Sequence, residues 1–301
     1  MLETDWRGLF AAVPTLFDKS GGLDEPGLAA HVRRLAMAGV ESFTVLGAAG
    51  ESAALTLEER RRVLDVTRDA AGDHAVLLAG VVGPDVEAGR VQAEQAATAG
   101  CDGLLVPPAP FLGADEGEAV AFVRTVARNV ALPVMLDSSA EASNAPATPA
   151  MLDALAEENM LVAVAQATGS TEFLGRVRDA LDDRFSLFWN ADETAPEALA
   201  AAADGWVSLA VNIFPEECVA LYRHGHAGDF TVVRRLGAWM GPVLRLCAGP
   251  RRTPAVKLAM QIMEHGNETM RSPLIPLSGS RRAALEAAMA QAIDTRLTFP
   301  F

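Results

Sequence analysis

Positive charge and long apolar runs are both scarce in this sequence. Its 25 Lys and Arg residues stand against 39 Asp and Glu residues, so the formal net charge is −14 at pH 7. Phosphate backbones are bound by clustered Lys and Arg, so we expect no nucleic-acid partner. No apolar run reaches the roughly 18 residues that a membrane span requires, and the first ten residues lack the basic and apolar segments of a signal peptide. We therefore expect a cytoplasmic protein without a membrane partner.

Cysteine and histidine are too few and too scattered to indicate a metal site or a disulfide framework. The cysteines are odd in number and widely spaced. No histidine falls at the end of a predicted strand, and the chain has neither a phosphate-binding loop ending in Lys-Ser/Thr nor a G-x-G-x-x-G motif after a strand. We therefore expect no metal and no cofactor. The three cysteines are Cys101, Cys218 and Cys247.

Lysine and tyrosine are nearly absent. The only lysines are Lys19 and Lys257, and the only tyrosine is Tyr222. An amine nucleophile must be neutral near pH 7 and must point at the carbonyl carbon of its substrate. Lys19 lies within the sequence D-K-S-G-G, which is typical of a solvated turn. The sequence therefore offers almost no candidate for covalent amine catalysis.

Short apolar runs alternate with longer amphipathic segments over roughly the first 225 residues, which is the pattern of repeated βα units. Helix boundaries are clear at several points, such as the capping box formed by Thr56 and Glu59. After residue 227 the sequence predicts three helices, over 230–246, 253–265 and 280–295, and no further strand. The predicted fold is α/β, a (β/α)8 TIM barrel over residues 1–226 with a helical C-terminal extension over residues 227–301 that packs on the barrel. The eight predicted strands are 9–14, 42–46, 75–82, 103–106, 133–136, 161–165, 185–189 and 207–211.

Five segments, spread in order over nearly the whole chain, match the motifs of one enzyme family. They are VPTLF at 13–17, GAAGES at 47–52 with the following L-T and E-R, AVAQATG at 163–169, Ser208 with Asn212, and RSPLIPL at 271–277. Together these segments resemble the dihydrodipicolinate synthase/N-acetylneuraminate lyase family. The resemblance implies a TIM barrel, a small oxo or hydroxy acid as ligand, and a homotetramer or homodimer.

The chain departs from this family where the family's chemistry is done. The resemblance implies a Schiff base on a lysine at the end of strand six, but that position is Ala165 here, and the position of the family's relay tyrosine is Asp137. The family's two threonines in G-T-T-G are Ala48 and Ala49, and an arginine that often binds a distal carboxylate would fall near Ala142. After strand four, PAP at 108–110 stands where many members carry P-Y-Y. Lys257 matches a family lysine that lies away from the pocket. We therefore expect no lysine Schiff-base aldolase activity.

Polar side chains at the predicted strand ends give the candidate site. Asp137 is a candidate general acid or base, or a carboxylate satisfied by neighbouring hydroxyls. Gln166 is a candidate for binding a substrate carbonyl, or an amide paired within the fold. The turn at 47–50 either binds an anion through its amides or is simply tight. The carboxylates of Asp137, Asp192 and Glu193 are of the kind that binds a divalent cation, but no histidine accompanies them at a predicted strand end, and no metal site is predicted. The candidate substrate-binding residues are Gly47, Ala48, Ala49, Gly50, Glu51, Ser138, Asn190, Asp192, Ser208 and Asn212.

Two hypotheses about function remain open at the level of sequence. In the first, the chain is a lyase-like enzyme that acts on a small oxo or hydroxy acid without a Schiff base, and Asp137 and Gln166 converge on an open pocket. In the second, it is a catalytically inactive barrel that binds a metabolite or a partner protein. The second hypothesis predicts a pocket filled by apolar side chains such as Trp189 or Phe111.

Overall fold

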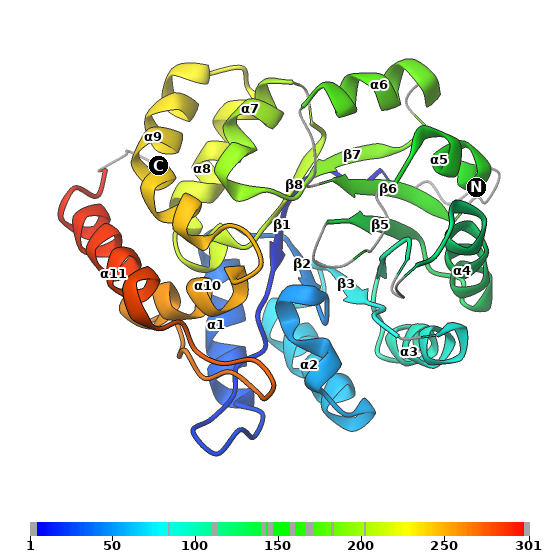
Figure 1. Ribbon diagram of the computed structural model, residues 1–301, viewed down its shortest axis with the longest axis horizontal. Helices are drawn as coiled ribbons and strands as arrows, with labels where there is room; N and C mark the ends of the chain where they lie inside the picture. Colours follow the sequence, from blue (N-terminus) through cyan, green and yellow to red (C-terminus); the bar gives the residue numbers. More distant parts are fainter. Residues whose placement is uncertain are drawn as a thin grey trace.

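Eight parallel strands close into a barrel in chain order, with each strand paired to the next and β8 paired to β1 (Figure 1). The computed structural model describes residues 5–83, 85–109, 113–139, 143, 147–156, 160–166, 171–181, 184–201 and 203–297. The predicted TIM barrel is confirmed. The strands are β1 (Gly8–Ala12), β2 (Ser42–Val45), β3 (Val76–Gly80), β4 (Gly103–Val106), β5 (Val134–Ser138), β6 (Leu161–Gln166), β7 (Ser186–Trp189) and β8 (Gly205–Ser208).

Helices follow each strand and surround the barrel, and three more helices form the predicted C-terminal region (Figure 1). The Thr56–Glu59 capping box opens α2 as predicted. Helix α9 packs against α7, α8 and α11, and α10 packs against α9 and α11. None of the helices in the described ranges is long and apolar enough to cross a membrane. The helices are α1 (Glu25–Met37), α2 (Leu57–Ala71), α3 (Val86–Thr98), α4 (Glu116–Asn129), α5 (Pro149–Ala156), α6 (Glu172–Leu181), α7 (Ala195–Ala200), α8 (Pro215–His226), α9 (Phe230–Cys247), α10 (Arg252–Ile262) and α11 (Gly279–Asp294), with 3-10 turns η1 (Ala48–Gly50), η2 (Ser52–Ala54), η3 (Asp192–Thr194) and η4 (Ala210–Asn212).

Buried side chains form two separate clusters, one inside the barrel and one between the barrel and its helices. Within the barrel, the rings of Phe10 and Phe188 meet edge to face with centroids 5.1 Å apart. Gly205 is required beside them, because an added Cβ would lie 2.1 Å from the Phe188 ring. For every strand except β2, the inner cluster shows which residues point inward, since side chains alternate between the two faces. It comprises Trp6, Phe10, Leu78, Leu105, Met135, Ala163, Ala165, Phe188 and Val207.

The eighth strand begins and ends earlier than its apolar run predicts. The run 207–211 predicts a strand there, but β8 covers Gly205–Ser208 and the chain then turns through η4. The reason lies in Asp192, whose carboxylate accepts hydrogen bonds from the backbone N–H groups of Leu209 (3.2 Å) and Ala210 (2.9 Å). These N–H groups bond to a side chain instead of a neighbouring strand, so the ladder stops at Ser208.

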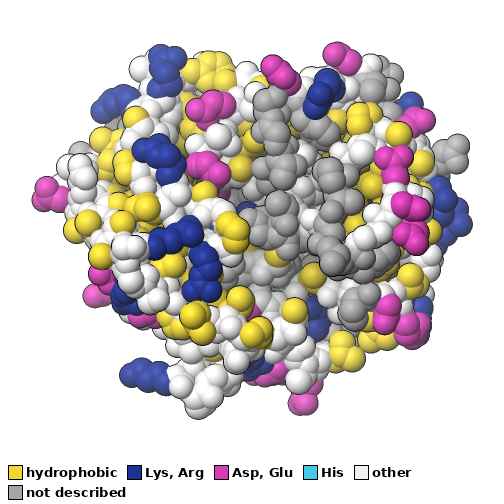
Figure 2. All heavy atoms as spheres, viewed as in Figure 1, with side chains coloured by type: hydrophobic (Ala, Val, Ile, Leu, Met, Phe, Trp, Pro, Cys, Tyr) yellow, Lys and Arg dark blue, Asp and Glu magenta, His cyan; other side chains and the backbone are white. Residues whose placement is uncertain are grey.

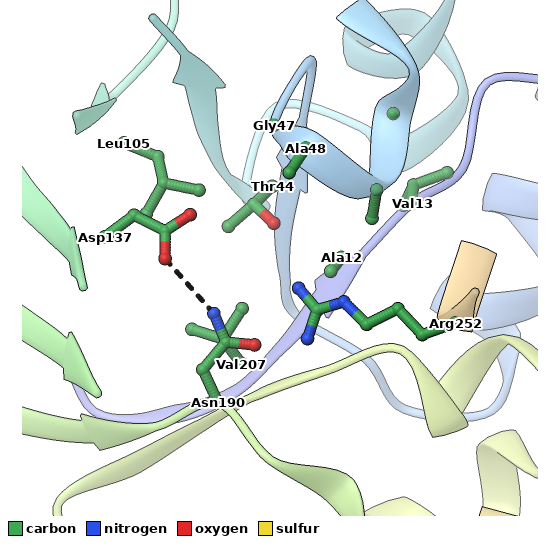
Figure 3. A pocket seen from close by; sticks show the side chains of 12 residues that line it. Ala12, Val13, Thr44, Gly47, Ala48, Leu105, Asp137, Asn190, Val207 and Arg252 are labelled. Atoms are coloured by element: carbon green, nitrogen blue, oxygen red, sulfur yellow. Dashed lines mark hydrogen bonds between the residues drawn. The ribbon is translucent and has the colours of Figure 1, made fainter. Parts of the chain in front are cut away.

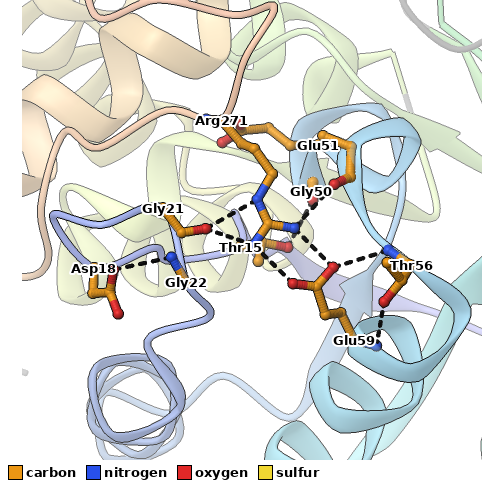
Figure 4. A network of polar contacts seen from close by, with 10 residues as sticks. Thr15, Asp18, Gly21, Gly22, Gly50, Glu51, Thr56, Glu59 and Arg271 are labelled. Carbon is orange, nitrogen blue, oxygen red and sulfur yellow. Dashed lines mark hydrogen bonds and ion pairs between the residues drawn. The ribbon is translucent and has the colours of Figure 1, made fainter.

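A polar network fastens the C-terminal region to the barrel, and Figure 4 shows the part of it around Arg271, Glu51 and Glu59. Lys257 of α10, fully buried, donates hydrogen bonds to the Glu51 carboxylate and to the Thr269 carbonyl oxygen. The other Glu51 oxygen accepts the Arg271 backbone N–H at 3.1 Å. The Arg271 guanidinium forms two 2.8 Å contacts with the Glu59 carboxylate. Because this network joins the segment after β2 to the tail, we expect it to contribute strongly to stability.

A buried histidine near the same region should make stability depend on pH. His31 Nε2 lies 2.8 Å from Asn212 Oδ1, and burial lowers the pKa of His31 from 6.5 to about 4. The unfolded state therefore binds more protons between these values, so stability is lost as the pH falls from 6.5 to 4, by up to about 3 kcal/mol. We expect His31→Gln to lose this part of the pH dependence.

The free energy of unfolding is measured by urea unfolding at pH 7.5 and at pH 4.5. At each pH, the value for wild type is subtracted from the value for the variant. That difference removes the contributions of other titrating groups, including His265, whose pKa burial also lowers. His74→Gln removes an exposed histidine and serves as the control. An equal loss of stability in wild type and His31→Gln on acidification would contradict the prediction.

Candidate active site

A small pocket with about 20 Å³ of accessible space lies at the carboxyl-terminal ends of the strands (Figure 3). This is the end of a TIM barrel at which active sites are found. Its floor is largely apolar, and its polar side chains come from β2, β5, the residue after β7, and α10. The lining residues are Ala12, Val13, Thr44, Gly47, Ala48, Ala49, Gly50, Leu105, Asp137, Asn190, Val207 and Arg252.

Asp137 contributes a buried carboxylate to this pocket. It lies two residues after Met135 of the inner cluster and is 4% exposed. Its Oδ1 accepts hydrogen bonds from the Ser139 backbone N–H (3.1 Å) and from Asn190 Nδ2 (3.3 Å). Each of these two donors is an N–H group, which a carboxylate oxygen can accept. A carboxyl group held in this way can exchange a proton with a bound molecule.

The turn at residues 47–50 forms one wall of the pocket. Gly47 has φ −75°, so no left-handed conformation demands a glycine there. A Cβ at Gly47 would point toward Leu105 Cδ2 at 3.5 Å, which is ordinary contact on the pocket side. Thr15 Oγ1 donates a 2.7 Å hydrogen bond to the Gly50 carbonyl oxygen and holds the turn from behind. The main effect of glycine at position 47 is therefore to leave space in the pocket.

Arg252 lines the pocket but is not among the candidates predicted from the sequence. It is the first residue of α10, and its guanidinium points into the pocket beside Ala12 and Asn190 (Figure 3). Residues at strand ends do not include Arg252, because it comes from the C-terminal region. Among the described residues, it is the one cationic side chain that lines the pocket.

Gln166 and Ser138, two other candidates, are not among the lining residues of the pocket. Ala165 belongs to the inner cluster and is fully buried, so the alternation of the strand turns Gln166 toward the helices. Ser138 likewise follows a residue that points inward, Asp137, so its side chain points away from the pocket. The Ser138 Oγ accepts a hydrogen bond of 2.7 Å from the Ala147 backbone N–H. Asp137 and Gln166 therefore do not converge on one spot.

Four further candidates hold the fold together around the pocket instead of lining it. Glu51 is paired with Lys257, and Asn212 Nδ2 donates 2.9 Å hydrogen bonds to the Ala12 and Leu209 carbonyl oxygens. Ser208 Oγ donates to Asp192 Oδ1 at 2.8 Å.

Asp192 also accepts a hydrogen bond from the Trp206 indole N–H at 3.1 Å, in addition to the two backbone N–H groups that end β8. Burial raises the pKa of Asp192 to about 6, although the Ser208 hydroxyl and the Arg252 charge act to lower it. Within the described ranges, no three His, Cys, Asp or Glu side chains gather as a metal-binding group would.

Trp189 does not fill the pocket. It belongs to the outer cluster, and its indole N–H donates to Thr194 Oγ1 at 3.0 Å. The other residue named for a filled pocket, Phe111, lies outside the described residues, as do Ala142 and Pro110. Trp189 therefore gives no support to the hypothesis of a closed pocket.

Comparison with known proteins places this geometry in a family. The model of the dihydrodipicolinate synthetase family matches residues 5–292. The chain belongs to the dihydrodipicolinate synthetase family. A 4-hydroxy-tetrahydrodipicolinate synthase of Natronomonas pharaonis is 30% identical over 292 residues, covering 96% of this chain and 99% of the relative. An uncharacterised DapA-like lyase of Halobacterium salinarum is 32% identical, with 95% of each chain covered.

Solved structures agree with this family membership. A dihydrodipicolinate synthase from Agrobacterium tumefaciens superposes with a TM-score of 0.89 at 26% identity, covering 96% of this chain and 98% of that one. A 4-hydroxy-tetrahydrodipicolinate synthase from Methylacidiphilum fumariolicum, at 22% identity and a TM-score of 0.90, supports the fold. In this member of the dihydrodipicolinate synthetase family, the inner position at the end of β6 is Ala165, and its register partner on β5 is Asp137.

Proposed function

We propose that this family member binds a small oxo or hydroxy acid in the pocket and acts as a lyase without forming a Schiff base. The observation that carries the proposal is the buried Asp137 carboxylate in a pocket that also receives the Arg252 guanidinium. Of the two lysines, Lys19 is exposed and Lys257 is paired with Glu51, and neither lines the pocket. Acid–base chemistry at Asp137 therefore replaces amine chemistry in the proposal.

Asp137 would exchange a proton with the ligand while its neighbours hold it in place. Asn190 and the Ser139 N–H fix the carboxylate by donating to Oδ1, so a proton is exchanged at a set position. Leu105 and Val207 give the pocket an apolar floor, which excludes water from the reacting group and strengthens electrostatic interactions with it. The C-terminal region is part of this machinery in the proposal, because Arg252 comes from α10.

The test is a thermal-shift and calorimetric screen of small oxo and hydroxy acids on wild type and Asp137→Asn. A ligand at 100 times its Kd stabilises the folded state by about 2.7 kcal/mol, so a clear rise in Tm is expected for wild type. We expect the rise to be lost in Asp137→Asn and kept in Asp153→Asn, which changes an exposed carboxylate. If no acid shifts the Tm of wild type, the inactive-barrel hypothesis is favoured. A ligand that binds without turnover would support binding and contradict the lyase activity.

A further inference from the structure

We propose that a second cavity, at the amino-terminal end of the barrel, binds a small zwitterion through Arg223 and Glu41. The ligand class is a molecule that carries one carboxylate and one ammonium group on a short carbon chain. The cavity has about 160 Å³ of accessible space and lies between β1, β2, the turn after α1, and helix α8. It shares no lining residue with the pocket at the other end of the strands, so binding here is separate from the proposed function.

One wall of the cavity is the outer face of the barrel at the start of β1 and β2. Phe10 and Ser42 are register partners on these strands, and Phe10 points into the barrel. Because side chains alternate along a strand, Leu9 and Glu41, each one residue earlier, lie next to each other on the outer face. Leu9 belongs to the outer cluster of buried residues, whereas Glu41 is exposed. This wall therefore sets a carboxylate beside an apolar surface.

The opposite wall is helix α8, which presents Val219, Tyr222 and Arg223 to the cavity. Tyr222 and Arg223 come three and four residues after Val219, so the three side chains share one face of the helix. The Tyr222 hydroxyl donates a 3.1 Å hydrogen bond to the Asp204 carbonyl oxygen, which fixes the ring. The Arg223 guanidinium lies against the turn after α1, because a Cβ added at Gly39 would be 3.2 Å from its Nη2. Gly39 has φ +94°, a conformation that favours glycine, and the missing side chain leaves room for the guanidinium.

The cavity offers one positive and one negative group that are not already paired. In the part of the chain that the structure describes, the side chains of Arg223 and Glu41 form no ion pair or hydrogen bond, with each other or with another residue. The charge of Arg7, by contrast, is taken up by Asp5 at 2.9 Å and Asp204 at 2.8 Å. A guanidinium matches the two oxygens of a carboxylate, and an ionised carboxylate accepts hydrogen bonds from an ammonium group. A zwitterion between Arg223 and Glu41 satisfies both, whereas a second carboxylate on the ligand would meet a like charge.

The space suits a short carbon chain between the two charged groups. An engineered protein cavity of about 150 Å³ holds a benzene molecule, so this one admits a ligand with a chain of about six non-hydrogen atoms. Leu9 and Val219, each 7% exposed, give the cavity apolar surface. Figure 2 shows Lys, Arg, Asp and Glu side chains spread over one face of the molecule, so single charges are common on this protein's surface. The cavity differs from such single charges because two opposite charges flank an apolar hollow.

The experiment is a titration with short aminoalkanoic acids, followed by ligand-observed NMR at low ionic strength because salt screens exposed charges. Each acid is compared with the alkanoic acid and the alkylamine of the same length. For wild type we expect the zwitterion to bind about tenfold more tightly than either counterpart, since each counterpart lacks one charge-assisted hydrogen bond. Arg223→Gln should weaken zwitterion binding about tenfold and leave alkylamine binding unchanged. Glu41→Gln should weaken zwitterion binding to a similar extent and leave alkanoic acid binding unchanged.

Matched variants control for the change in net charge. Arg234→Gln and Glu58→Gln each remove an exposed charge that does not line the cavity, and both should bind like wild type. Arg223→Lys should restore part of the binding, because a lysine supplies the charge without the planar fork. Asp137→Asn changes the pocket at the other end of the strands and should leave zwitterion binding unchanged. Circular dichroism of every variant establishes that it is folded.

A preference for the zwitterion that Arg223→Gln and Glu41→Gln both abolish supports the site. Equal binding of the three compounds, or no binding of any of them, overturns it. A preference that either variant leaves intact, or that Asp137→Asn removes, also overturns it, because the zwitterion would then occupy a different site. None of these results decides the proposed function, which is tested with oxo and hydroxy acids that carry no ammonium group.

Discussion

Replacing Lys257 with methionine is expected to lower the free energy of unfolding by about 3–5 kcal/mol, the usual cost of leaving one partner of a buried ion pair alone. Both side chains of the Lys257–Glu51 pair are fully buried. Burial lowers the pKa of Lys257, and the Glu51 carboxylate opposes that shift. Without the ammonium group, Glu51 would keep only the Arg271 backbone N–H as a hydrogen-bond donor within the described part of the chain. Urea unfolding of the two proteins gives the difference.

A double-mutant cycle identifies the origin of this loss. Lys257→Met combined with Glu51→Gln removes both charges, so the double variant should regain about half of the lost stability or more. Arg271 makes a separate set of contacts with Glu59 and the Gly21 carbonyl oxygen, which the double variant leaves in place. The explanation would be wrong if Lys257→Met lowered the free energy of unfolding by less than about 1 kcal/mol. It would also be wrong if the losses measured for Lys257→Met and Glu51→Gln separately summed to the loss in the double variant.

The barrel could be predicted from the sequence because its strands are buried on both faces. Such strands appear as continuous apolar runs, and the helices between them carry local start signals such as the Thr56 capping box. Local sequence patterns could not predict where β8 ends. The strand ends where Asp192, in the segment after β7, accepts hydrogen bonds from the backbone of the residues that follow β8. Contacts of this kind join residues that are 17 and 18 positions apart and leave no periodic trace.

The candidate site was predicted in part, for reasons that differ from residue to residue. Asp137 and Asn190 line the pocket because strand ends converge there. The family resemblance places Ala165 on the pocket side, and neighbouring residues of a strand point to opposite faces. The orientation of Gln166 away from the pocket therefore follows from the sequence. Arg252 could not be predicted, because its position depends on how α10 packs against η4 and the rest of the tail.

Borohydride reduction in the presence of pyruvate is expected to add no mass to either lysine of the wild-type protein. An imine requires a neutral amine aimed at a carbonyl carbon. Lys257 donates to Glu51 in a fully buried pair, and Lys19 is exposed beyond the end of β1. Intact mass followed by peptide mapping separates a lysine adduct from one on the terminal amine.

A variant with an amine at the end of β6 serves as the positive control for this experiment. Ala165→Lys alone would set an ammonium group beside Asp137, its register partner, and their attraction would keep the amine protonated. The double variant Ala165→Lys/Asp137→Asn removes that charge, so we expect it to trap pyruvate while wild type does not. Because Ala165 is fully buried, the added side chain costs some stability, about 1–3 kcal/mol for an overpacked core. An adduct on Lys257 of wild type would instead mean that the buried pair opens to the pocket, and the proposal of chemistry without a Schiff base would fall.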